Sequence, residues 1–309
     1  MASGSLILNY AGGILLGLGF MAHVAHAVLL ARGRLSLGLA VPGPRPAYAG
    51  IVTGSFVERR ERAAPGGEPV SPARPFAIGM TWIAIALLGL SLAMRAILVG
   101  RGPWGNLFEF SVAFAFTMAT GYMLLARRYP IRSIGFIPLG VALGLLVYAM
   151  SLPNEIEPLV PALENRPLLT IHVGMATIAY GIFATSFAAG VGYLVQGRGD
   201  RFAWLPSHRV LDEVAYRAVI VGFPIFATMI ILGSWWASIA WSRYWGWDPK
   251  ETSALVTWLI YAVYLHARNQ RAWAGRPAAL LLVVGFAMVI VTYSGSLWFS
   301  GLHAYSGLN

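Results

Sequence analysis

Apolar residues run through this chain in eight long segments, and most of the charged residues lie in the stretches between them. Each segment approaches the roughly 20 apolar residues that a helix needs to cross about 30 Å of hydrocarbon, at a rise of about 1.5 Å per residue. The pattern therefore predicts an all-α polytopic membrane protein with about eight transmembrane helices. We expect these helices near residues 6–31, 76–99, 107–126, 133–150, 168–195, 214–236, 253–267 and 277–299.

The composition excludes an ordinary soluble domain. Hydrophobic residues occupy 58% of the 309 positions and charged residues only 11%, a balance that is typical of proteins embedded in a bilayer. The chain also has no cysteine, so it can form neither a disulfide nor a thiolate metal site. Any thiol chemistry at this protein must use the cysteines of a partner.

The basic residues indicate how the chain is oriented in the membrane. Sixteen of the 22 lysines and arginines lie in the loops at residues 32–75, 127–132, 197–213 and 268–276. Under the positive-inside rule these loops face the cytoplasm, so both termini and the tryptophan-rich loop face outward across a bacterial plasma membrane. The first arginines follow the first apolar segment, so we expect that segment to remain as an anchor and not to act as a secretory signal. This orientation accounts for the net charge of +10, and no nucleic-acid partner is expected.

Tryptophan is concentrated in the loop between the sixth and seventh apolar segments. Five of the eleven tryptophans lie within residues 235–247. An aromatic belt at the membrane interface would scatter indoles over many helix ends, as we expect for Trp82, Trp104, Trp204, Trp273 and Trp298. The clustered indoles differ, because Gly246 and the 241/245/247 spacing let several large rigid rings share one surface. We predict a flat apolar shelf for a planar cofactor, with Trp258 left to ordinary packing.

The run Asp248-Pro249-Lys250-Glu251 predicts the start of the next helix. Asp248 as N-cap, Pro249 at the first helical position and Glu251 at the third form a capping box. A second interpretation stays open beside this one. Asp248 can also orient a ligand or an indole N–H, and Lys250 can meet an acidic group.

Two histidines are expected at the same membrane face as the tryptophans. His172 lies near the start of the fifth apolar segment, and its helix face continues through Ala176, Ala179 and Phe183. Those small residues suit either a flat ring or helix packing, but a histidine at the membrane is costly enough to be a functional candidate. His303 follows the last apolar segment. Because imidazole is a normal axial ligand of haem iron, the pair is suited to hold one porphyrin from both sides.

His266 cannot belong to that outer site. It lies eighteen residues after Asp248 on one predicted helix, a separation of about 27 Å at about 1.5 Å per residue. Its expected depth matches that of His23 and His26, so a second, inner site is possible. The alternative for all three is an interfacial or packed histidine, and His208 is expected as an ordinary residue of a polar loop.

The segment from Trp236 to Thr252 closely resembles the WWD domain of haem-handling membrane proteins, and most closely the CcsA (ResC) family of System II cytochrome c synthases. The residues that carry the resemblance are Trp241, Tyr244-Trp245, Trp247-Asp248-Pro249-Lys250-Glu251-Thr252, Trp258, Tyr264-Leu265-His266 and Gly301-Leu302-His303-Ala304-Tyr305, with a looser match from Leu168 to Tyr180. Residues 105–309 are thus interpreted as a haem-handling membrane core with its WWD loop at 235–252. Residues 1–104 form the N-terminal helices and a cytoplasmic loop rich in proline and arginine.

The resemblance implies a role for each candidate at the outer face. His172 and His303 would be the axial ligands of the iron of haem b. The platform for this haem would consist of Trp236, Trp241, Trp245, Trp247 and Asp248. Two positions depart from the family, because Ser242 stands where glycine is usual and Ser253 where tryptophan is frequent.

The resemblance also implies an inner haem and a reaction. His266 would bind the iron of a second haem, with the opposing ligand supplied by a CcsB (ResB)-type membrane subunit, and His23 and His26 are the alternatives within this chain. With that partner the protein would act as a holocytochrome c synthase, a lyase that joins haem by thioethers to a Cys-x-x-Cys-His segment of apocytochrome c. One alternative is haem delivery of the CcmC type, to a chaperone and without bond formation. Another is a b-type electron carrier, which needs paired histidines on facing helices.

Overall fold

The computed structural model describes residues 2–36, 70–156, 165–270 and 273–303, and within them all regular secondary structure is helical. This confirms the predicted all-α class. The elements in chain order are α1 (Ala2–Ser36), α2 (Ala73–Val99), α3 (Leu107–Arg128), the short 3-10 helix η1 (Arg132–Ile134), α4 (Phe136–Ala149), α5 (Arg166–Gln196), α6 (His208–Ala240), α7 (Pro249–Arg268) and α8 (Arg276–Trp298).

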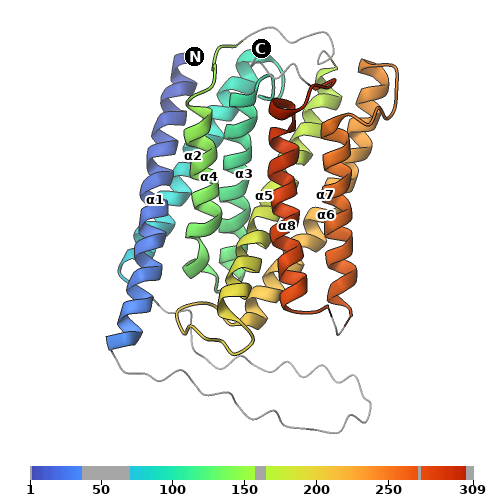
Figure 1. Cartoon of the computed structure of the whole chain (residues 1–309). Coiled ribbons are helices and arrows are strands. Elements are labelled where there is room, and N and C mark those ends of the chain that lie inside the picture. The colour runs from blue at the N-terminus through green and yellow to red at the C-terminus, as the bar shows by residue number, and fades with distance from the viewer. Residues whose placement is uncertain (1, 37–69, 157–164, 271–272, 304–309) are drawn as a thin grey trace.

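The eight α-helices stand side by side in one bundle, with their axes roughly aligned (Figure 1). On one side α1 packs against α2 and α4, and on the other α7 packs against α8 and α6. The central helices α3 and α5 pack against each other and join the two sides. The start of α1, the end of α8 and the loop between α6 and α7 lie at the same end of the bundle (Figure 1), as the alternation of apolar segments predicts. We call this end, which carries the candidate site, the cavity end.

Seven of the described helices are long and apolar enough to cross a membrane. The exception is α7, whose 20 residues include charged groups in both its first and its last turn. It nevertheless runs beside α8 and α6 along the bundle (Figure 1). Large apolar side chains are exposed on the outside of the helices, with Ile97 76% exposed, as contact with lipid tails requires. The chain is therefore a multi-pass membrane protein.

Close contact between α3 and α5 fixes the helix that carries His172. A Cβ atom on Gly181 of α5 would lie only 2.6 Å from the backbone of Thr117 on α3, so glycine is required for the two backbones to approach. The hydroxyl of Thr117 donates a hydrogen bond of 2.7 Å to the carbonyl of Thr177 across the same contact. Small residues and such hydroxyl bonds are the usual means by which helices associate in a bilayer.

Candidate functional site

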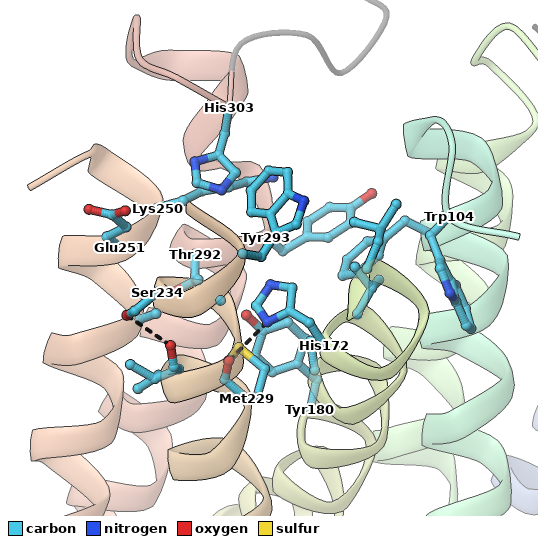
Figure 2. A pocket seen from close by; sticks show the side chains of 18 of the residues that line it. Trp104, His172, Tyr180, Met229, Ser234, Lys250, Glu251, Thr292, Tyr293 and His303 are labelled. Atoms are coloured by element: carbon cyan, nitrogen blue, oxygen red, sulfur yellow. Dashed lines mark hydrogen bonds between the residues drawn. The ribbon is translucent and has the colours of Figure 1, made fainter. Parts of the chain in front are cut away.

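A cavity of about 180 Å³ lies between the ends of α3, α5, α6, α7 and α8 at the cavity end (Figure 2). Its walls are mostly apolar, and His172 and His303 both line it. The two residues belong to segments 131 positions apart, on α5 and in the tail that follows α8. The structure therefore gathers in one cavity the two histidines that the sequence placed at one membrane face.

His172 is held by α6. Its Nδ1 lies 2.9 Å from the carbonyl oxygen of Met229, and because a carbonyl only accepts, the ring must carry its proton at Nδ1. The lone pair is then at Nε2. Gly233, one turn further along α6, provides the space, because a Cβ there would come within 2.6 Å of the His172 ring. Trp236 stacks nearly parallel to the imidazole, at 6.5 Å between ring centroids and 10° between planes.

His303 is held by Asp248. The carboxylate of Asp248 accepts a hydrogen bond of 2.8 Å from His303 Nδ1 and one of 2.6 Å from the backbone N–H of Leu302. Gly301 permits this approach, because a Cβ atom there would collide with the same carboxylate. One acidic side chain thus attaches the C-terminal tail to the start of α7 and directs the proton of the imidazole to Nδ1.

Asp248 also caps α7, and the predicted capping box is confirmed. Its Oδ2 accepts from the backbone N–H of Lys250 at 2.9 Å, while Glu251 accepts from the N–H groups of Gly246 and Asp248 at 2.8 and 3.2 Å. The two interpretations that the sequence left open for Asp248 are therefore compatible. One carboxylate starts the helix and orients a histidine.

Burial at this pair favours a neutral imidazole beside a carboxylate. Burial alone would raise the pKa of Asp248, but the hydrogen bond and charge of His303 and the N–H groups of Lys250 and Leu302 hold that pKa below its usual value. Burial lowers the pKa of His303, the bond to Asp248 opposes this, and the charge of Lys250 lowers the pKa further. The lowered pKa of His303 favours the neutral ring, with its lone pair at Nε2.

The tryptophans form walls and supports, and the predicted flat shelf is not what the structure contains. Trp236 and Trp245 line the cavity. Trp241 lies behind them, edge-to-face with Trp236 at 4.7 Å and with His303 at 4.9 Å. Trp247 is 68% exposed and stands at 90° to Trp245. Edge-to-face contacts are the preferred geometry of neighbouring rings, and they turn adjacent indoles away from a common plane.

Trp104 is a cavity residue that the sequence analysis assigned to the aromatic belt. It forms part of the wall near α3 (Figure 2), and its indole N–H is buried without a hydrogen-bond partner in the described structure. Its loop is fixed by Glu109, which is 1% exposed and binds Arg95 at 3.0 Å, Arg101 at 3.3 Å and the N–H of Gly105 at 2.7 Å. The available signal was a tryptophan in the run Gly102-Pro103-Trp104-Gly105, just before the N-cap Asn106 of α3.

Other lining residues had no distinctive sequence signal. Met229 contributes a backbone carbonyl, which any residue has, and Gly233 is one of 35 glycines. Tyr293 lines the cavity from α8 and shares a hydrogen bond of 2.6 Å with Ser111 of α3. Of the face that continues from His172, Ala176 lines the cavity, whereas Ala179 and Phe183 belong to the buried core. Trp258 stacks on Phe223 at 5.0 Å, which is the ordinary packing expected of it.

The remaining histidines lie away from this cavity. His266 is exposed near the end of α7, with Gln270 at 2.7 Å. His23 and His26 are buried on α1, within 3.3 Å of the Arg132 carbonyl and 2.7 Å of the Ser71 hydroxyl respectively. Helices α1 and α7 stand on opposite sides of the bundle (Figure 1), so the described chain does not pair His266 with either. His208 is hydrogen-bonded to Asp200 at 3.0 Å.

Similarity to known proteins covers most of the chain. A family model described as "Cytochrome C assembly protein" matches residues 78–303. A cytochrome c biogenesis protein CcsA from Synechococcus elongatus is 34% identical over 284 residues, which span 74% of this chain and 87% of the relative. Similar proteins of the same description come from Porphyra purpurea, at 30% over 309 residues (85% and 96%), and from Guillardia theta, at 32% over 258 residues (75% and 85%). The matched region includes the whole cavity.

Proposed function

This chain belongs to the cytochrome c assembly protein family, among the CcsA proteins of cytochrome c biogenesis, and from that premise we propose that its cavity presents haem for attachment to apocytochrome c. Haem is here the substrate that is passed on. The cavity end would face outward across a bacterial plasma membrane, because the described loops that carry arginines at 127–132 and 197–213 lie at the opposite end.

One observation carries the proposal. Two imidazoles from different segments line one largely apolar cavity, and each has its Nδ1 proton bound by a fixed acceptor, Met229 O or the Asp248 carboxylate. Ligating histidines nearly always have such an acceptor behind them, because it sets the tautomer, orients the ring and raises the basicity of the other nitrogen. Neutral Nε2 nitrogens are the donors that haem iron takes on its two axial sides. The donor set therefore fits a haem held by His172 and His303.

The aromatic residues fit the rest of such a substrate. Trp236, Trp245 and Trp104 offer large apolar faces around the two histidines, which suit a planar macrocycle. Trp241 would support the site from behind, through its contacts with Trp236 and His303. Trp247 is mainly exposed. It would therefore contribute to haem binding through its contact with Trp245 or from the surface of the protein.

Bond formation would use the substrate's own groups. Haem b supplies two vinyl groups, and each cysteine S–H of the Cys-x-x-Cys-His segment adds across one of them, so that a C–S bond forms and the thiol proton goes to the neighbouring vinyl carbon. No external oxidant or reductant is needed for this addition. The chain's part is to hold the ring in one orientation until the histidine of apocytochrome c replaces one imidazole, which is catalysis by positioning. Because the chain has no cysteine, no thiol of its own competes.

A second haem site at His266, completed by a CcsB-type subunit, remains part of the proposal. The position of His266 supports it: the ring is exposed on the outside of α7, where another subunit can reach it. His23 and His26 are buried beside η1 on the far side of the bundle, so a partner is the better source of the opposing ligand.

The visible spectrum of the purified protein, with and without the partner subunit, tests the cavity assignment. Wild type should carry haem with the spectrum of two axial imidazoles, and the double variant His172→Ala/His303→Ala should lose that species. His208→Ala is the matched control, because this histidine begins α6 beside Asp200, at the end of the bundle opposite the cavity. Unchanged haem content and spectrum in the double variant would show that the cavity does not hold haem.

A further inference from the structure

Lys250 brings a positive charge to the cavity. Binding of iron by the two histidines does not require this charge. Lys250 is the second residue of α7 and lines the cavity together with His172 and His303. Within the part of the chain that the structure describes, its ammonium group forms no hydrogen bond or ion pair; the lysine takes part only through its backbone N–H. A cation among apolar walls is costly unless an anion meets it.

The neighbouring carboxylates are already engaged. Asp248 accepts hydrogen bonds from His303, from Leu302 and from the backbone of Lys250. One oxygen of Glu251 accepts two backbone N–H groups of the preceding loop, and Figure 2 shows the carboxylate at the margin of the site, away from His172. Neither acid is therefore placed as a close partner of the Lys250 ammonium.

The stem of Lys250 passes along α8. Its Cγ lies beside Gly295, where a Cβ atom would come within 3.9 Å of it. Thr292, about one turn earlier on α8, also lines the cavity. A lysine stem commonly covers apolar surface while its head reaches a polar or charged group. The packing thus places the stem of Lys250 on the α7–α8 side of the cavity.

The opposite wall has a different character. It is formed by Trp104 and Leu107, around the start of α3, and Figure 2 shows Trp104 across the cavity from Lys250. A ligand that matches both sides is a large apolar ring with an anionic group on one edge.

We propose that Lys250 binds a carboxylate of the substrate and thereby sets which edge of the ring faces α7 and α8. This inference rests on the proposed function, under which the carboxylate is a propionate of haem. It makes Lys250 a specificity residue, distinct from the two iron ligands.

Paired porphyrins and paired variants test the inference by equilibrium binding. The full-length protein in detergent is titrated with haemin and with haemin dimethyl ester, whose propionates are neutral, and binding is read from the Soret band and from quenching of tryptophan fluorescence. Lys250→Met removes the charge and keeps the stem, whereas Lys250→Arg keeps the charge. Arg243→Met is the matched control, because it removes one positive charge from the adjacent loop, where Arg243 is exposed.

Wild type should bind haemin about ten- to a hundredfold more tightly than the ester, the range expected for one hydrogen bond to a charged group. Lys250→Met should bring this ratio close to one while leaving the affinity for the ester unchanged, which also shows that the variant is folded. Lys250→Arg and Arg243→Met should keep most of the ratio. A wild-type ratio that persists in Lys250→Met overturns this inference alone, whereas failure of wild type to bind either porphyrin overturns the proposed function as well.

Discussion

The two ends of the bundle both contain histidines, but only the cavity end brings two of them to one cavity. There His172 and His303 line a common space, although they are far apart in sequence. At the opposite end, His23 and His26 are buried on α1 while His266 is exposed on α7, on the other side of the bundle. The cavity end can thus be assembled by one chain, whereas the described structure brings neither histidine of α1 to His266.

Hydrogen bonding alone does not distinguish the two ends. His23 bonds to a backbone carbonyl, as His172 does. The difference lies in what surrounds the ring. His172 stacks on Trp236 beside a glycine and lines a cavity, whereas His23 packs edge-on against Tyr122 at 5.7 Å in a filled interface. A buried, bonded imidazole becomes a candidate ligand only where neighbouring segments leave space in front of its second nitrogen.

The largest expected effect comes from removing either cavity histidine. His172→Ala and His303→Ala should each abolish cytochrome c maturation in cells, because each removes one axial bond from the substrate haem. Free imidazole should restore part of the yield by occupying the vacated iron position. Holocytochrome c, measured by haem stain, checks both statements. Full maturation by both variants without imidazole would contradict the assignment of His172 and His303 as haem ligands. The two ends of the bundle would then no longer differ in this respect.

A smaller effect is expected at Asp248, which separates the orientation of His303 from the helix start. Asp248→Ala should lower haem affinity about ten- to a hundredfold, as loss of the acceptor behind a ligating histidine typically does. It should also cost about 1 kcal/mol of stability through the lost cap. Asp248→Asn should retain the stability, because asparagine caps a helix as well as aspartate does. It should still weaken haem binding, because an amide has one accepting oxygen and cannot accept from His303, Leu302 and Lys250 together.

Haem titration and thermal unfolding of both Asp248 variants separate these contributions. Glu251→Gln serves as control, because its amide oxygen can still accept from the loop backbone. Equal haem affinity in Asp248→Asn and wild type would mean that the carboxylate acts only as a helix cap.

The opposite end should respond more weakly. His266→Ala should lower the amount of haem that reaches the cavity several-fold while leaving the shape of its spectrum unchanged, because supply falls but the geometry at the cavity end does not. His23→Ala and His26→Ala should not reduce haem per folded protein if the partner supplies the opposing ligand. Haem content and spectra of protein purified with its partner provide the measurement. Normal loading and normal maturation in His266→Ala would rule out the inner site.

The smallest effect concerns the backbone of the tryptophan loop. Ser242 has a φ of +55°, the left-handed conformation that favours glycine, and the WWD family resemblance places glycine at this position. Ser242→Gly should therefore stabilise the protein by about 0.5–1 kcal/mol and raise its unfolding midpoint by about 1–3 °C. Ser238→Gly, inside α6, should have the opposite sign. A lower midpoint in Ser242→Gly would show that the serine side chain outweighs the backbone strain.

Much of the fold could be predicted because local sequence decides it. Apolar runs long enough for a bilayer correspond to the observed helices, and the capping box of α7 needs only residues 248–251. Successive segments cross the membrane in alternating directions. The tryptophan loop, His172 and His303 were therefore predicted to lie at the same end of the bundle. Two local details were not predicted. The first helix extends beyond its expected bounds at both ends, and α7, which was predicted as a transmembrane helix, falls short of the apolar character of the other seven.

Only the tertiary structure decided which role each candidate residue has. Trp104 entered the cavity wall because buried charges hold its loop, and Trp247 was turned outward on a backbone with a φ of +54°. Asp248 reaches a tail 54 residues further along the chain, and the partner of His172 is a carbonyl whose position depends on how α5 and α6 cross. Sequence patterns record preferences within a few residues, so they determined the helices, their caps and the end of the bundle at which each side chain lies. Which side chains meet depends on helix packing and loop geometry between distant segments, and only the folded arrangement fixes those.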